Sequence, residues 1–158
     1  MAVTRPTYAA AAAITITLVN LANSATAARA STAVDNSTTL YDDALVSLTV
    51  KPLTGTPAAN AAVYVYLYAL SDGGAYTDSI TGTDAAFTLP SVPNVVLARV
   101  LPITVSAGTV VSLPFSVALC FGGTMPQRWG VCVLNSCGFA LDATIGSASY
   151  IGVTYTTV

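Results

Sequence analysis

The sequence of 158 residues contains no histidine, the side chain that most often serves as a general base, a metal ligand or a pH switch. A Ser-His-Asp or Cys-His catalytic arrangement is therefore excluded. The acidic residues are all aspartates, and only Asp42 and Asp43 are adjacent. Neighbouring side chains of a strand point to opposite faces, so these two carboxylates cannot share one acid–base site. We predict a loop rim over residues 35–43 and no catalytic residue.

Three other aspartates, Asp72, Asp78 and Asp84, recur at six-residue intervals from a Gly73-Gly74 turn onwards. Oxygen-rich loops can hold Ca²⁺, but this spacing does not match the EF-hand loop. Aspartate is also an ordinary turn residue, because its side chain hydrogen-bonds to nearby backbone. We therefore interpret these three aspartates as structural.

The three cysteines, Cys120, Cys132 and Cys137, could supply sulfur ligands to zinc. A structural zinc site needs a fourth ligand, and an aspartate such as Asp142 would be an unusual one. The Gly122-Gly123 pair lacks the following lysine and helix of a phosphate-binding loop. The sequence thus predicts neither a metal nor another cofactor.

The cysteines leave one disulfide open. A bridge between Cys132 and Cys137 requires Cα atoms within about 7 Å of each other, which a tight turn at Asn135-Ser136 would allow. The alternative, which we favour, is that these cysteines are reduced and buried as small hydrophobic residues.

The composition points to assembly rather than to catalysis. Charged residues make up only 8% of the sequence, the net charge is −2, and the mean hydropathy is +0.69. So little charge does not keep copies of a chain apart, and we expect much of the surface to be covered by other copies or by a partner. Nucleic acid is not an expected partner, because the basic residues form no stripe. They are Arg5, Arg29, Lys51, Arg99 and Arg128.

Apolar and polar residues alternate with a period of two in several segments, which predicts strands with one buried face. The alanine-rich stretches 9–13 and 24–30 could each hold a short helical turn, and the rest of the chain shows no helical pattern. We predict an all-β fold, a single-domain antiparallel β-sandwich of jelly-roll type with eight or nine short strands. The predicted strands include residues 14–18, 44–50, 63–68, 85–89, 95–101, 110–119, 129–134 and 149–156.

The N-terminal residues 1–8 are interpreted as an arm and residues 9–158 as the sandwich domain. The first 30 residues imitate a secretory signal, but Thr15 and Thr17 alternate with aliphatic residues, which suits a strand better. No run reaches 18 uninterrupted apolar residues, so we predict no transmembrane helix and no membrane partner. We expect the arm to lie against a neighbouring subunit, because so polar a segment cannot order itself.

Aromatic residues are the main candidates for contact surfaces, since tyrosine and tryptophan are enriched at interfaces. Tyr64, Tyr66 and Tyr68 share one face of a predicted strand, which is either an interface or a core face with hydroxyls at its rim. Trp129 is either a contact anchor or a core residue, and we favour the core. The interface candidates are Arg5, Pro6, Tyr8, Tyr64, Tyr66, Tyr68, Tyr76, Arg128 and Trp129.

Two stretches, VYVYLYALSDGGAYTD at residues 63–78 and FGGTMPQRWGV at residues 121–131, carry a resemblance to a known class. With the Gly-Thr-Asp step at 82–84, and with Asn135 and Gly138, they resemble patterns in small structural proteins of tailed-bacteriophage virions. The resemblance covers much of residues 40–157 and implies no catalytic residues. It implies a capsid decoration (cement) protein or a head–tail accessory protein, assembled into the virion in the host cytoplasm.

We therefore expect a non-enzymatic virion protein that forms a homo-oligomer, with a trimer favoured, and that clamps the major capsid protein or another virion protein. Three alternatives stay open. One is a tail, neck or fibre component, and another is a receptor- or glycan-binding module that uses Tyr76 with Asp72 and Asp78. The third is a secreted or pilus-like adhesin subunit, which would require cleavage near residues 28–30.

Overall fold

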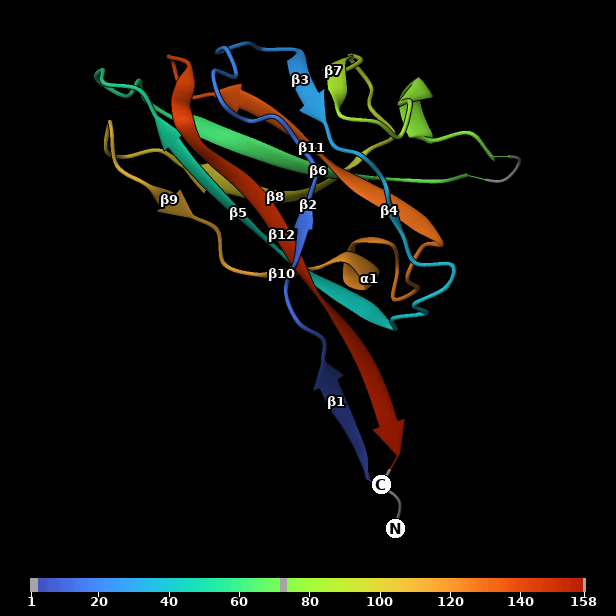
Figure 1. Ribbon diagram of the computed structural model, residues 1–158. Coiled ribbons are helices and arrows are strands. Elements are labelled where there is room, and N and C mark those ends of the chain that lie inside the picture. Colours follow the sequence, from blue (N-terminus) through green and yellow to red (C-terminus); the bar gives the residue numbers. More distant parts are fainter. Residues whose placement is uncertain (1–2, 72–73, 158) are drawn as a thin grey trace.

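A computed structural model describes residues 3–71 and 74–157 and shows two antiparallel sheets stacked as a sandwich (Figure 1). Strands make up 49% of the chain and helix 5%. The predicted all-β antiparallel sandwich is confirmed, with twelve strands in the described residues rather than eight or nine. The elements are β1 (Thr4–Tyr8), β2 (Ala12–Ile14), β3 (Ala27–Ala30), β4 (Val34–Asp35), β5 (Asp43–Pro52), β6 (Ala62–Ala69), the 3-10 helix η2 (Thr77–Ser79), β7 (Ala85–Thr88), β8 (Val96–Pro102), β9 (Val110–Val111), β10 (Phe115–Ser116), α1 (Val117–Cys120), β11 (Arg128–Ser136) and β12 (Leu141–Thr157).

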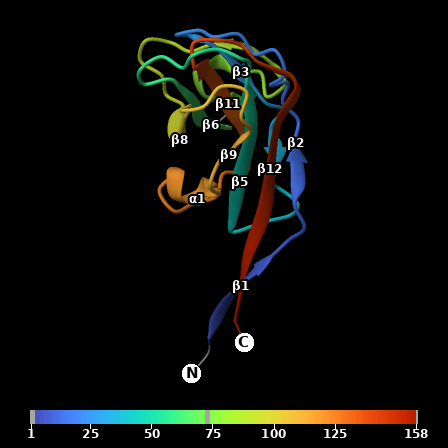
Figure 2. The ribbon, with the colours of Figure 1, turned by 90° about the vertical axis from the view of Figure 1, so that its left-hand side faces the viewer.

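Each sheet is built around one long central pair of strands. In the first sheet the order is β1-β12-β5-β10, and β2 and β9 also pair with β12 and β5. In the second sheet the order is β7-β3-β11-β6-β8, and β4 also pairs with β11. Strand β12 runs on beyond the sandwich, where only β1 accompanies it (Figures 1 and 2).

The core lies between the two sheets, and the period-two pattern of the sequence decides which residues enter it. In β5 every second residue is buried, with Val46, Leu48 and Val50 fully inaccessible to solvent. In β6 the aliphatic residues Val63, Val65 and Leu67 are likewise inaccessible. The expected division of residues 63–68 into an aliphatic face and a tyrosine face is therefore confirmed.

The second sheet is also apolar on its outer face, where Tyr68 and Cys132 lie in a smaller hydrophobic cluster. The segment that follows β6 folds back over this face and adds Ile80 and Val95 to the cluster. The Tyr68 hydroxyl donates a hydrogen bond of 2.6 Å to the carbonyl oxygen of Ser31. A sheet buried on both faces needs few polar positions, which accounts for the continuous apolar run Val131–Leu134.

Several sequence-based boundaries are wrong. Residues 15–18 continue from β2 without strand structure, and the alanine-rich stretches 9–13 and 24–30 contribute to β2 and β3 rather than to helical turns. The run 110–119 is divided into β9, β10 and α1. The helix starts where the Ser116 side chain accepts a hydrogen bond from the Leu119 amide, which is an N-cap that ends strand pairing.

The three cysteines are free thiols, so the structure contains no bridge between Cys132 and Cys137. The two side chains lie in different clusters, Cys137 in the main core and Cys132 on the outer face. Burial, with a smaller contribution from the Asp78 charge, raises the pKa of the Cys132 thiol to about 12. This thiol therefore stays protonated at neutral pH and acts as a small hydrophobic side chain.

Replacement of Gly130 by alanine should destabilise the sandwich. The ring of Tyr68 lies over Gly130 on the paired strand, and a Cβ atom there would overlap it. Overpacking of this kind costs about 1–3 kcal/mol, which chemical denaturation would measure. Gly108→Ala is the matched control, because the nearest side-chain atom to its new Cβ is 3.7 Å away; equal stability of the two variants would contradict the prediction.

Candidate assembly interface

The two ends of the described chain form a two-stranded ribbon that projects from the sandwich (Figures 1 and 2). Residues Thr4–Tyr8 pair antiparallel with residues 153–157 of β12, from Thr4 opposite Thr157 to Tyr8 opposite Val153. All five residues of β1 are exposed, as are Tyr155 and the two threonines that follow it. The ribbon therefore holds its shape by backbone pairing and not by packing on the sandwich.

The ribbon has one apolar face and one polar face. Directly opposed residues of an antiparallel pair lie on the same face, and Pro6 is opposite Tyr155. Pro6, Tyr8 and Tyr155 consequently share a face, on which the tyrosines are 60% and 55% exposed. The other face carries Arg5 and only threonines beside it. Pro6 and the two tyrosines are therefore exposed on one face, on which Val153 is buried.

The outer edge of β1 is open in the described residues, and the outer edge of β12 is open beyond Tyr155. Strand β1 pairs only with β12, and the pairing of β5 with β12 ends at Asp43 opposite Val153. Asp42 extends the contact by one step, because its carboxylate accepts a hydrogen bond of 2.7 Å from the Tyr155 amide. An isolated two-stranded ribbon is marginally stable in water, and open strand edges invite pairing with another chain. The ribbon is thus suited to docking.

The expectation that the N-terminal arm lies on a neighbouring subunit rather than on its own chain needs correction. Met1 and Ala2 are outside the described residues, but residues 4–8 are ordered by their own C-terminal strand. The sequence argument counted only side-chain area and missed the backbone hydrogen bonds that β12 offers. Arg5, Pro6 and Tyr8, which are three of the predicted interface residues, do lie together on an exposed strand.

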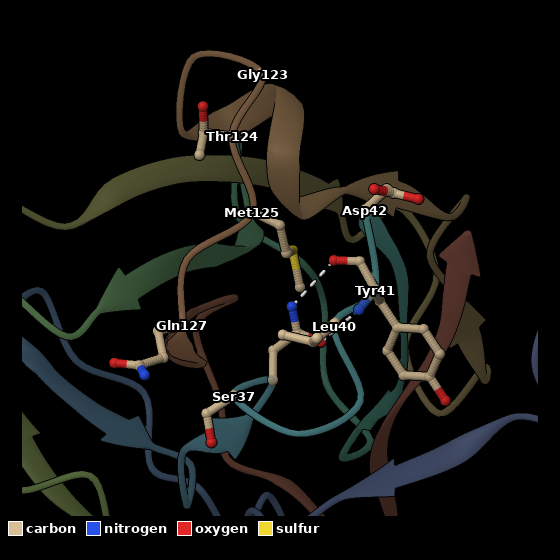
Figure 3. A pocket seen from close by; sticks show the side chains of 9 residues that line it. Ser37, Leu40, Tyr41, Asp42, Gly123, Thr124, Met125 and Gln127 are labelled. Carbon is tan, nitrogen blue, oxygen red and sulfur yellow. Dashed lines mark hydrogen bonds between the residues drawn. The ribbon is translucent and has the colours of Figure 1, made fainter. Parts of the chain in front are cut away.

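A cleft of about 490 Å³ opens at one side of the sandwich, between the loop that follows β4 and the loop that follows α1 (Figure 3). The first loop supplies Leu40 and Asp42, and the second supplies Met125. Figure 3 shows the Met125 side chain pointing into the space beside Leu40, while the Tyr41 ring points away. The lining contains one carboxylate and no basic residue.

The Asn36 side chain holds the first loop in shape. Its amide oxygen accepts hydrogen bonds from the Tyr41 amide at 2.9 Å and from the Thr39 hydroxyl at 3.0 Å. Its amide nitrogen donates to the Tyr41 carbonyl at 3.0 Å. Asn36 is itself nearly inaccessible, at 6% exposure. The loop is therefore an ordered wall of the cleft.

This loop holds Leu40 in an unfavourable backbone conformation with its side chain in solvent. Leu40 has φ 52° and is 70% exposed. The left-handed region costs a residue with a Cβ atom about 1–2 kcal/mol, and a bulky residue there is an outlier. Strain that surrounding contacts over-determine is a pointer to function, here to the presentation of an apolar side chain.

Half of the few charged residues form ion pairs within the chain. Three ion pairs join Arg29 to Asp84, Lys51 to Asp142, and Arg128 to Asp35. In the described residues the other two basic side chains, Arg5 on the ribbon and Arg99 on β8, form no ion pair. The adjacent Asp42 and Asp43 bind on different sides, Asp42 to the ribbon and Asp43 to the Ala118 amide of α1. The two carboxylates therefore point to different sides, as their adjacent positions predict.

The remaining interface candidates divide between core and surface. Trp129 is fully buried, as favoured, with its ring edge-on to Tyr150 at a centroid distance of 5.5 Å. Tyr68 is also fully buried, so it cannot serve as a contact residue. Tyr64 and Tyr66 are half-buried on the outer face of the second sheet, and Arg128 is exposed but bound to Asp35.

Two residues of the alternative glycan-binding site, Tyr76 and Asp78, make contacts within the chain. The Tyr76 ring packs edge-on against Tyr68, at a centroid distance of 5.5 Å. Both carboxylate oxygens of Asp78 accept hydrogen bonds from Asn94 or Val95. Asp72 lies outside the described residues. Asp78 therefore serves to fasten one loop to another, as its interpretation as a structural residue predicts.

Asp84 has a similar structural role. Its carboxylate accepts hydrogen bonds from the Thr17 amide at 3.1 Å, from the Thr17 hydroxyl and from Arg29. Burial alone would raise the pKa of Asp84, but the hydrogen bonds from Arg29 and Thr17 and the Arg29 charge together lower it below its usual 3.8. Within residues 3–71 and 74–157, no three Cys or Asp side chains are placed to hold a metal ion.

Sequence reasoning missed Leu40, Met125 and Tyr155 as surface residues. Leu40 and Met125 sit in loops whose sequences give no periodic signal, and their proximity depends on two segments far apart in the chain. Tyr155 belongs to a predicted strand, but its face follows only from its register with β1. The pairing of the two chain ends carried no local signal.

Comparisons with known proteins add no identification: no protein-family model, curated protein or solved structure matches the chain. In the part of the chain that the structure describes, no helix has the length and apolar character needed to cross a membrane. The interface therefore has to be judged on its own geometry.

Asp84→Asn should destabilise the protein at neutral pH by about 1–2 kcal/mol, because the Arg29 guanidinium loses its charged acceptor. The lowered pKa of Asp84 means that its contribution is fully present above pH 3.8 and is lost as the pH falls through the folded-state value. The difference between wild type and variant in denaturant-induced unfolding should therefore shrink on acidification below this pH. A difference that grows on acidification would contradict the assignment.

Proposed function

We propose that the chain is a non-enzymatic structural component of a tailed-bacteriophage virion, and that it acts as a capsid decoration protein. In this function it bridges neighbouring capsid subunits and stabilises the shell. The virion assignment rests on the sequence resemblance described above. The observation that carries the assembly function is the projecting ribbon with its exposed apolar face.

The ribbon supports assembly for two physical reasons. First, it presents Tyr8 and Tyr155 together on one face, and exposed aromatic side chains are the residues that most often dominate binding energy. Second, the outer edge of β1 and the end of β12 beyond Tyr155 are open, so a partner strand can add hydrogen bonds there, with Pro6 offering its carbonyl only.

The sparse charge supports the same proposal. Three of the five basic side chains are held in ion pairs within the chain, so little charge is left to oppose contact between neutral surfaces. The half-buried tyrosines Tyr64 and Tyr66 lie beside Leu97 and Val100 on β8, which are 50% and 39% exposed. This second apolar surface is available for contacts with a capsid neighbour.

The number of copies in a purified particle distinguishes decoration from the alternative function in a tail, neck or fibre. We expect the ratio of this chain to the major capsid protein to be close to that of a component spread over the whole shell. Quantitative mass spectrometry of purified particles measures this ratio. A few copies for each particle would exclude decoration and favour the tail, neck or fibre alternative.

Removal of the apolar face of the ribbon should weaken incorporation. We expect Tyr8→Ser combined with Tyr155→Ser to lower occupancy in particles about tenfold, and deletion of residues 1–8 to lower it at least as far. Circular dichroism should show that the sandwich stays folded, because these side chains are exposed. The matched control is Thr7→Ala with Thr154→Ala on the polar face of the same pair. Equal occupancy of the tyrosine variant and its control would rule the ribbon out.

A further inference from the structure

The cleft between the loops at residues 36–42 and 121–127 is complementary to the ribbon in both charge and polarity. The cleft presents the exposed carboxylate of Asp42 beside the apolar side chains of Leu40 and Met125. The ribbon presents Arg5 on one face and Pro6 with Tyr8 on the other. We propose that the cleft receives the ribbon of a second copy of this chain. This inference rests on the proposed assembly function and specifies what the projecting ribbon binds.

Charge is the first argument for a second copy. In the described residues the basic side chains that form no ion pair are Arg5 and Arg99, and Arg5 is the one carried on the projecting element. The cleft lining contains a carboxylate and no basic residue. The Asp42 carboxylate uses one oxygen, Oδ2, for the Tyr155 amide of its own ribbon. Its other oxygen can accept a hydrogen bond from the Arg5 guanidinium of the neighbour.

The conformation of Leu40 is the second argument. The loop is held by Asn36 so that Leu40 stays at φ 52° with its side chain in solvent, at the mouth of the cleft. An apolar side chain presented in this way gains by being covered. The carbon stem of Arg5 on the incoming ribbon is a suitable cover, because a long basic side chain buries its stem while its charge meets an acid.

The alternating pattern of the ribbon specifies how it enters. If the open edge of β1 leads, the Arg5 face meets the wall that carries Leu40 and Asp42, and the Pro6 and Tyr8 face meets the wall that carries Met125. The ribbon that enters and the cleft that receives it are different parts of the molecule, so the contact is heterologous. Heterologous contacts close into a ring when the rotation between copies allows it and form an open filament otherwise; the trimer expected from the sequence would be one such ring.

A charge exchange between the two residues tests the proposal. The variants Arg5→Asp and Asp42→Lys should each weaken self-association of the purified protein about tenfold or more, because like charges then meet in the cleft. Sedimentation velocity over a concentration series measures this effect. Asp42→Asn is the control for the Tyr155 contact, since an amide oxygen still accepts that hydrogen bond; it should weaken association through loss of charge alone.

Combining the two charge changes in one chain is the decisive step. Every ribbon–cleft contact between copies of the double variant Arg5→Asp/Asp42→Lys pairs opposite charges, whatever the number of copies in a ring, so the double variant should associate as the wild type does. Failure of the double variant to recover association would show that the two residues do not meet between chains and would overturn the proposal. Wild-type association by either single variant would overturn it as well.

Leu40→Gly separates binding from folding. Glycine adopts positive φ without strain, so the melting temperature should stay the same or rise, while self-association should weaken about tenfold. Unchanged association of Leu40→Gly would exclude the cleft as the docking site. A wild-type protein that stays monomeric at all concentrations would exclude the second copy as occupant, whereas the proposed virion function is decided separately by the occupancy of the ribbon variants in particles.

Discussion

The length of β12 is the constraint on which the rest of the molecule depends. It runs for 17 residues, whereas β5, its partner in the sandwich, has 10. The last residues of β12 therefore extend beyond the sheet, and their backbone groups need another partner or water. Strand β1 supplies that partner, which brings the two described ends of the chain together and creates the projecting ribbon. The exposed apolar face of the ribbon follows from the register of this pairing.

The second sheet shows how a chain with so few charges still folds to one structure. Its inner face packs into the main core, and the segment after β6 covers much of its outer face. The charges that are present connect loops to strands, as Asp84 does with Thr17 and Arg29. Charge is thus used mainly inside the chain, and the outer surface consists largely of alanine, threonine, serine and uncovered apolar residues. Such a surface favours contact with other protein surfaces.

The ribbon and the cleft are two parts of one physical argument. Each leaves apolar side chains in solvent, and each is held in place by hydrogen bonds that do not depend on those side chains: backbone pairing in the ribbon and the Asn36 amide in the cleft. A preorganised surface loses less conformational freedom on binding. The ribbon and the cleft are therefore better suited to binding a partner than Trp129 or Tyr68, which are buried.

Predictions from the sequence succeeded where the alternation of residues within a single strand was enough to decide the structure. The alternation in residues 44–50 and 63–68 was enough to place the buried faces of β5 and β6, and the burial of Trp129 was also expected. Predictions failed where a local pattern had two readings. The run 110–119 was predicted as one strand but is divided into β9, β10 and α1. For the tyrosine face of residues 64–68, an interface and a core face were both open, and a later segment covers Tyr68.

By itself the sequence determined the class of fold, the reduced state favoured for the cysteines, and a surface with little charge, because these properties follow from residue types and from spacing within a strand. The tertiary structure alone decided which apolar residues stay in solvent. Exposure depends on neighbours that are distant in the chain: Tyr8 meets Val153 only through the β1–β12 pairing, and Leu40 meets Met125 only across the cleft. No local pattern encodes such meetings, since each is settled by the packing of the whole sandwich.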